Sequence, residues 1–130
     1  MTDVLATDPT TIAAEFAHAI ATGDRGALRG RLADEVDFKA VTPGRAWESR
    51  SADEVVGTIL DTWFGGQRRI DSVECTETDT FADIVRVGYR FRASTPTGPA
   101  LVEQQAYLTV ADGTITSVRI VCSGYRALPG

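Results

Sequence analysis

The sequence predicts an α+β domain in which a curved antiparallel sheet wraps around three helices from the N-terminal half of the chain. Two patterns predict this class. Apolar residues recur at helical spacing in three segments of the first half, whereas the later segments alternate between apolar and polar residues and are rich in β-branched and aromatic side chains. The length of 130 residues fits one domain over residues 1–130, with an ordered core over about 9–127.

Three segments have the spacing of amphipathic helices. The first two are predicted over 10–22 and 25–33 and form a helical hairpin, with Gly23 as the stop signal between them. The third begins at a capping box that runs from Ser51 to Glu54, in which the serine and the glutamate satisfy exposed backbone N–H groups, and it ends at Gly65.

The other segments alternate with period two and are predicted strands. Between residues 84 and 93, for example, one face is apolar and the other carries three arginines, so one face is buried and the other is exposed. The predicted order of elements is ααββαββββ. The strands cover 36–42, a short stretch around Trp47, 69–78, 84–93, 101–110 and 115–123.

Helices packed on one face of a bent sheet predict an apolar pocket, because the layers close at one end and open at the other. Trp47 and Trp63 are expected either to rim this opening or to fill the core. The polar side chains of Tyr89 and Gln104 face inward, where they either bond each other or the backbone, or face a wet or liganded cavity. The predicted ligand-binding residues are Phe16, Phe38, Trp63, Tyr89, Phe91, Gln104 and Cys122.

Four stretches, taken in order, resemble the nuclear transport factor 2-like superfamily, also called SnoaL-like. They are 16–24 (FAHAIATGD), 32–38 (LADEVDF), 42–44 (TPG) and 110–119 (VADGTITSVR), and the resemblance extends over nearly the whole chain. It implies a hydrophobic cone and, frequently, a homodimer through the sheet. It also implies a range of activities that includes ketosteroid isomerases, polyketide cyclases, epoxide hydrolases, dehydratases and plain binders, so the fold does not determine the function.

The catalytic groups of these subfamilies have no match in this chain. The resemblance places the isomerase tyrosine at Phe16, its base at Ala40 and its second aspartate near Ala106, none of which can transfer a proton. Epoxide hydrolases and cyclases require an inward carboxylate or imidazole. Glu103 is predicted on the outer side unless a bulge reverses it, and His18 lies on the solvent side of the first helix.

Composition excludes several partners. A net charge of −5 repels nucleic acid, and neither an export signal nor an apolar membrane-spanning run is present, so we expect a cytoplasmic protein that contacts no membrane. Cys75 and Cys122, with the one histidine, are too few for a zinc site, so no metal or cofactor is expected. Both thiols are predicted to be buried and unreactive, since no second histidine or flanking cation would activate Cys122 as a nucleophile.

The predicted outer face of the sheet is mixed in charge, with arginines and Glu103 side by side. It is either a solvated face or a two-fold homodimer interface in which each arginine meets the partner's glutamate. Three functions therefore stay open. The favoured one is a domain that binds a small apolar molecule, and the alternatives are an isomerase, cyclase or hydrolase acting on a hydrophobic substrate and a homodimeric interaction module with a filled cone.

Overall fold

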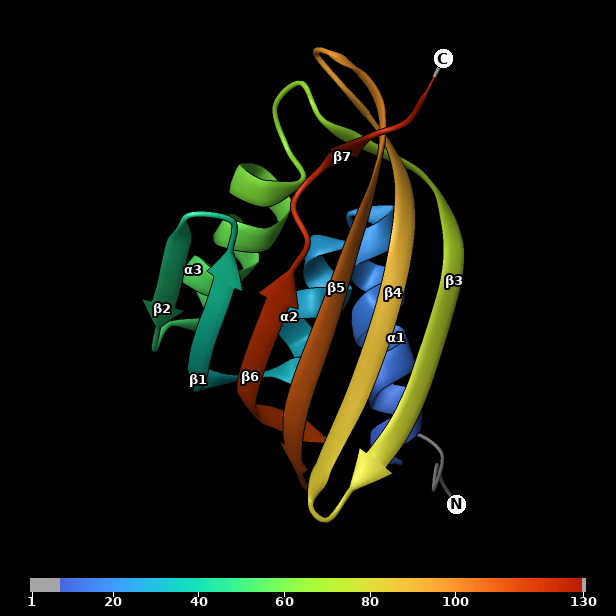
Figure 1. The fold of residues 1–130 in the computed structure, drawn as a ribbon. Helices are drawn as coiled ribbons and strands as arrows, with labels where there is room; N and C mark the ends of the chain where they lie inside the picture. The colour runs from blue at the N-terminus through green and yellow to red at the C-terminus, as the bar shows by residue number, and fades with distance from the viewer. Residues whose placement is uncertain (1–7, 130) are drawn as a thin grey trace.

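The computed structural model describes residues 8–129, in which three helices pack on one face of a curved sheet (Figure 1). The predicted α+β class and order of elements are confirmed, with the short strand β7 in addition. Expectations for the first seven residues and for Gly130 lie outside the described residues. The elements are α1 Pro9–Thr22, α2 Arg25–Arg31, β1 Leu32–Thr42, β2 Arg45–Ser49, α3 Ala52–Gly57, the π-helical turn η2 Thr58–Trp63, β3 Arg69–Phe81, β4 Ile84–Thr95, β5 Gly98–Ala111, β6 Thr114–Cys122 and β7 Arg126–Ala127.

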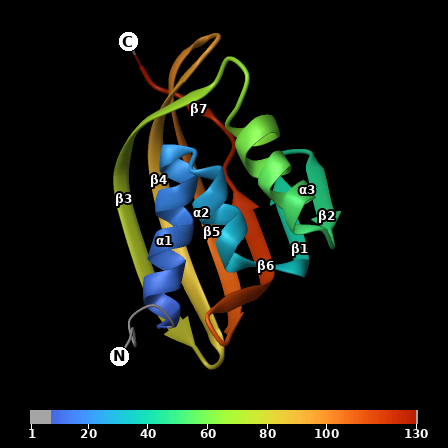
Figure 2. The ribbon, with the colours of Figure 1, turned by 180° about the vertical axis from the view of Figure 1, so that it is seen from behind.

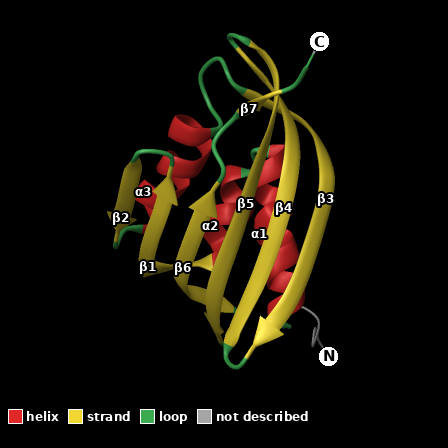
Figure 3. Ribbon diagram, viewed as in Figure 1, coloured by secondary structure: helices red, strands yellow, loops and turns green. Residues whose placement is uncertain are grey.

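The strands form one sheet in the order β2-β1-β6-β5-β4-β3, and β7 pairs with β5 (Figure 3). Every neighbouring pair is antiparallel, as expected, except β1 and β6, which run parallel with Phe38 opposite Val118. The sheet is therefore mixed. Period-two alternation is the same in parallel and antiparallel strands, so the sequence pattern does not reveal the direction of this pair.

The helical hairpin turns at Gly23, as the sequence predicts, and its first helix begins at Pro9. Asp8 caps α1 by accepting a hydrogen bond from the Thr10 N–H, and Gly23 ends the helix in the left-handed conformation at φ 67°. The predicted end of the second helix at residue 33 is wrong. Leu32 is already extended, with φ −91° and ψ 138°, so residues 32–35 belong to β1.

The third helix changes geometry along its length. The serine half of the predicted capping box is confirmed, since Ser51 accepts a hydrogen bond from the Glu54 N–H. The glutamate half is wrong, because the Glu54 carboxylate accepts from the Ser49 hydroxyl and the Ser51 N–H donates to Ser49 Oγ instead. The helix then widens from Thr58 onwards into a π-helical turn, which closes with a hydrogen bond of 3.1 Å from the Phe64 N–H to the Ile59 carbonyl. Trp63, the last residue of this turn, and Phe64, which follows it, are both buried.

All the helices lie on the concave side of the sheet, with α1 against β3 and β4, and α3 against β1 (Figure 2). The inward faces predicted for the strands are confirmed, since Val36, Phe38 and Ala40 of β1 and the apolar face of β4 are buried in the core. The edge strand β3 is largely exposed and includes Cys75, so the expectation of two buried thiols is wrong for this residue. Within residues 8–129, no helix is long and apolar enough to cross a bilayer.

Candidate functional site

A cavity of about 500 Å³ opens at one end of the molecule. The β1–β2 turn, the segment that follows η2 and the segment between β6 and β7 all lie at this end (Figure 1). We call it the mouth cavity. Its lining residues are Thr42, Pro43, Arg45, Trp47, Thr62, Trp63, Phe64, Arg68, Val102, Gln104, Cys122, Ser123, Gly124 and Tyr125.

Aromatic side chains form much of the wall of the mouth cavity. Trp47 and Trp63 meet edge to face with ring centroids 5.8 Å apart, and the Phe38 ring lies 6.0 Å behind Trp63. The Tyr125 hydroxyl donates a hydrogen bond of 2.6 Å to the Trp63 carbonyl. Tyr125 also meets Phe64 edge to face. These contacts join the segment after β6 to the end of η2 and hold both sides of the opening together.

Gln104 is the one polar or charged residue that is fully buried in residues 8–129, with 1% of its surface exposed. Its Oε1 accepts a hydrogen bond of 2.6 Å from the Tyr89 hydroxyl. Burial raises the pKa of Tyr89 well above its ordinary value, so the phenol stays protonated and acts as the donor. This bond orients the amide, because the reverse orientation would leave the Tyr89 O–H without its acceptor.

Two buried N–H donors of cavity-lining residues have no hydrogen-bond partner among the described residues: Gln104 Nε2 and Trp63 Nε1. Trp63 is 7% exposed. The neighbouring indole differs, since Trp47 Nε1 donates to Thr42 Oγ1 at 2.8 Å. A buried donor without an acceptor costs about 1–3 kcal/mol, so two of them in one cavity wall are a substantial cost.

The charged residues that line the mouth cavity are both arginines. The Arg45 guanidinium lies 3.6 Å from the centre of the Trp47 ring, and that of Arg68 lies 5.5 Å from the centre of the Tyr125 ring. No Asp, Glu or His of residues 8–129 lines the cavity. Burial raises the pKa of Tyr125 to about 12, so this phenol is protonated at neutral pH.

The structure places the seven predicted ligand-binding residues in two layers. Three of them, Trp63, Gln104 and Cys122, line the mouth cavity, and Trp47 lines it as well. The other four lie in the core, and three of them contact residues of this wall. Phe38 packs on Trp63, Tyr89 bonds Gln104, Phe91 meets Phe64 edge to face, and Phe16 is buried on α1.

The two alternative catalytic candidates do not reach the mouth cavity. Glu103 faces outward, as alternation predicts, and accepts hydrogen bonds from Arg90 Nε at 2.9 Å and Arg126 Nη2 at 2.7 Å. His18 is exposed on α1, on the solvent side that the helical spacing predicts. The positions matched to isomerase catalytic residues, Phe16, Ala40 and Ala106, are buried in the apolar core.

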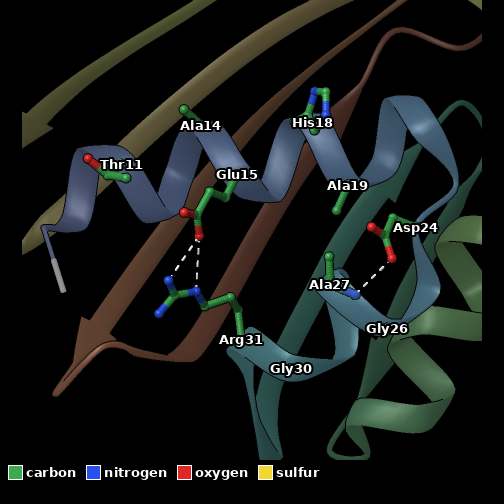
Figure 4. Close-up of a pocket in the computed structure, with 10 residues that line it drawn as sticks. All are labelled: Thr11, Ala14, Glu15, His18, Ala19, Asp24, Gly26, Ala27, Gly30 and Arg31. Carbon is green, nitrogen blue, oxygen red and sulfur yellow. Dashed lines mark hydrogen bonds and ion pairs between the residues drawn. The ribbon is translucent and has the colours of Figure 1, made fainter. Parts of the chain in front are cut away.

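A second hollow of about 610 Å³ lies between α1 and α2 (Figure 4). It is lined mainly by small residues, and an ion pair of 3.0 Å between Glu15 and Arg31 joins the two helices there. His18 and Asp24 also line it. This groove is larger than the mouth cavity, but neither of the two unpaired buried donors lines it. It is therefore less suited to recognise a polar group of a ligand.

Three helices packed on the concave face of one bent sheet, with a cavity at one end, make this chain a cone-shaped α+β protein. Comparison with solved structures shows that this chain has the nuclear transport factor 2-like fold. A nuclear transport factor 2-like protein from Burkholderia xenovorans superposes with a TM-score of 0.64 at 18% identity, covering 86% of this chain and 86% of that one.

Two further structures have the same fold. An LEH-like epoxide hydrolase from M. tuberculosis superposes with a TM-score of 0.67 at 14% identity, covering 88% of this chain and 82% of its own. A protein with a ketosteroid isomerase-like fold from Catenulispora acidiphila, solved in complex with trimethylamine, gives 0.64 at 19% identity, covering 86% and 85%. No protein-family model and no curated protein matches the sequence.

Proposed function

We propose that this chain binds a small, largely apolar molecule in the mouth cavity and pairs an oxygen acceptor of that molecule with Gln104 and Trp63. The observation that carries the proposal is the pair of buried, unpaired N–H donors behind an aromatic wall. A ligand carbonyl would remove the cost of leaving them unpaired. The volume of about 500 Å³ lies in the range typical of small-molecule sites.

Neither nitrogen is open to solvent in this conformation. Binding of the acceptor therefore includes a side-chain adjustment in the wall. The Tyr89 hydroxyl holds Gln104 Oε1, so we expect the amide to keep its orientation while the side chains that cover Nε2 and the Trp63 N–H move.

The chemistry of the wall favours binding over an isomerase, cyclase or hydrolase activity. General acid–base catalysis needs a group that exchanges protons near the working pH. The cavity has no carboxylate or imidazole among the described residues, and the pKa of Tyr125 is about 12. The epoxide hydrolase of M. tuberculosis therefore supports the fold of this chain, and its activity is not part of the proposal.

A matched pair of probes tests the proposal. Benzophenone and diphenylmethane differ only by a carbonyl in place of a methylene, and their affinities can be compared by isothermal titration calorimetry. We expect benzophenone to bind about 5–10-fold more tightly, as one net hydrogen bond predicts. Failure of both probes to bind, or equal affinities, would contradict the proposal.

Two tryptophan variants locate the effect. Trp63→Phe removes an unpaired donor while keeping an aromatic ring, so it should reduce the preference for benzophenone. Trp47→Phe is the matched control, because its N–H is already bonded to Thr42 and is not available to a ligand. Equal loss of preference in both variants would argue that wall shape, and not the donor of Trp63, selects the carbonyl.

The two thiols provide a second readout that does not depend on a tryptophan variant. Cys122 is half-buried in the cavity wall, whereas Cys75 is exposed on β3, outside the mouth cavity. Saturating benzophenone should slow alkylation of Cys122 in a Cys75→Ser variant and leave alkylation of Cys75 unchanged in a Cys122→Ser variant. Unchanged rates at both thiols would place the ligand elsewhere.

A homodimer through the outer face of the sheet stays a second proposal. Val41 and Val121 are opposite each other on β1 and β6, each 55% exposed on this face. The arginines of this face already meet carboxylates within the chain, as Arg119 does with Asp37. The apolar pair is therefore the part that an interface would cover. Sedimentation of Val121→Glu should show monomers where the parent chain shows dimers, and a monomeric parent chain would refute the proposal.

A further inference from the structure

We infer that the molecule bound in the mouth cavity is an apolar carboxylic acid whose carboxylate is held at the entrance by Arg45 and Arg68. The inference rests on the proposed function, because it specifies the charge of the same ligand. Three features of the described residues support it: how the arginines are paired, how the two guanidinium groups are held, and the absence of acidic residues from the cavity lining.

The arginines at the entrance of the mouth cavity differ from most other arginines of the described residues, because they have no carboxylate partner. Within residues 8–129, nine of the twelve arginines lie within ion-pair distance of a carboxylate. The three that have no such carboxylate are Arg45, Arg50 and Arg68, and two of these three line the mouth cavity. In a chain with a net charge of −5, two uncompensated cations in one cavity form a local positive site.

Both guanidinium groups are positioned by aromatic rings and not by carboxylates. Arg45, at the start of β2, stacks over Trp47, and Arg68, just before β3, lies over Tyr125. Neither guanidinium group donates a hydrogen bond to another described residue, and the one such bond from Arg68 comes from its backbone N–H to the Gly65 carbonyl. Stacking therefore restrains the two side chains while their N–H groups stay available, and the planar array of donors on a guanidinium matches the two oxygens of a carboxylate.

The other residues that line the mouth cavity carry no negative charge that would repel an anion. The other polar side chains at the entrance, Thr42, Thr62 and Ser123, are neutral, and no acidic side chain of the described part of the chain lines the cavity. The groove between α1 and α2 differs, since Arg31 there already pairs with Glu15, and Asp24 adds a second carboxylate that would repel an anion. The apolar body of an acid held at the entrance would extend along Trp63 and Val102.

Diphenylacetic acid and diphenylacetamide test the inference, because they have nearly the same shape and differ in charge. By isothermal titration calorimetry at low salt we expect the acid to bind about 10-fold more tightly than the amide. The preference should shrink at high salt, because both arginines are exposed to solvent. Arg45→Gln and Arg68→Gln should each weaken acid binding about 3-fold, and the double variant should abolish the preference for the acid over the amide.

Arg50→Gln is the matched control, because it removes the third unpaired arginine outside the mouth cavity and changes the net charge equally. It should leave the preference for the acid intact. If Arg50→Gln reduces this preference as much as Arg45→Gln does, the preference depends on net charge alone and the inference is overturned. Equal binding of acid and amide by the parent chain would also overturn it, while the proposed function would stand. If neither these two compounds nor benzophenone binds, both proposals fail.

Discussion

The buried pair formed by Gln104 and Tyr89 allows a quantitative test of the unpaired donor. We predict that Tyr89→Phe destabilises the protein, that Gln104→Met leaves its stability nearly unchanged, and that the double variant is more stable than the parent chain. The reason is the number of buried polar groups left without a partner in each variant. In the parent chain Tyr89 and Gln104 Oε1 satisfy each other, and Gln104 Nε2 alone is unpaired.

The magnitudes follow if each unpaired buried group costs about 2 kcal/mol. Tyr89→Phe leaves both amide atoms of Gln104 unpaired and should lower the free energy of unfolding by about 2 kcal/mol. Gln104→Met removes Nε2 but leaves the Tyr89 hydroxyl unpaired, so the two effects cancel. The double variant leaves neither group unpaired and should raise the free energy of unfolding by about 2 kcal/mol above the parent value.

Urea unfolding followed by circular dichroism gives the free energy of unfolding of all four proteins under one condition. Equal m-values would show that the variants expose the same surface on unfolding, so that their free energies can be compared. If Gln104→Met is as destabilising as Tyr89→Phe, and the double variant is no more stable than the parent chain, then Nε2 is paired in solution. That result would refute the reasoning and would remove one of the two donors from the proposed site.

Three further predictions concern stability. The hydrogen bond from Arg119 is the main reason why the pKa of Asp37 lies below its ordinary value of 3.8. The ion pair therefore stabilises the fold fully above pH 3.8, and this stabilisation is lost as the pH falls through the lowered pKa. Asp37→Asn should flatten the acid side of a plot of unfolding free energy against pH. Gly124→Ala should cost about 2 kcal/mol in urea unfolding, because φ is +75° and a Cβ would lie 2.6 Å from Pro43 Cγ. Ser51→Ala removes the cap of α3 and should lower the unfolding free energy by about 1 kcal/mol, whereas Ser51→Asp should restore it.

The parts of the fold that follow from local spacing are visible in the sequence. Alternation in β4 identifies its buried face because successive side chains point to opposite sides of a strand. Ser51 marks a helix start because its hydroxyl oxygen satisfies an N–H group that the helix leaves free. The parallel pairing of β1 with β6 leaves no such mark, since it depends on how the long intervening chain returns to the sheet.

Some residues of the candidate site can be predicted from local spacing, and others cannot. Gln104 and Cys122 lie on inward faces of regular strands, so alternation points both toward the helices. Arg45, Arg68 and Tyr125 come from the ends of strands and from connecting segments, where no period applies and the position of a side chain depends on the path of the whole chain. The π-helical turn is also hidden, because adjacent apolar pairs are compatible with an α-helix of the same length.

The contrast between two adjacent tryptophans connects stability with function. Trp47 and Trp63 touch edge to face and both line the mouth cavity, but only Trp47 has an acceptor for its N–H, the Thr42 hydroxyl. A wall that served packing alone would gain nothing from the Trp63 N–H, since phenylalanine presents an aromatic ring without a polar group to desolvate. The unpaired donor lowers the stability of the empty protein, and that cost is removed only when an acceptor enters the cavity. In the function that we propose, the group that weakens the fold would also make the cavity selective, because an oxygen-bearing ligand would form a hydrogen bond that a hydrocarbon of the same shape cannot form.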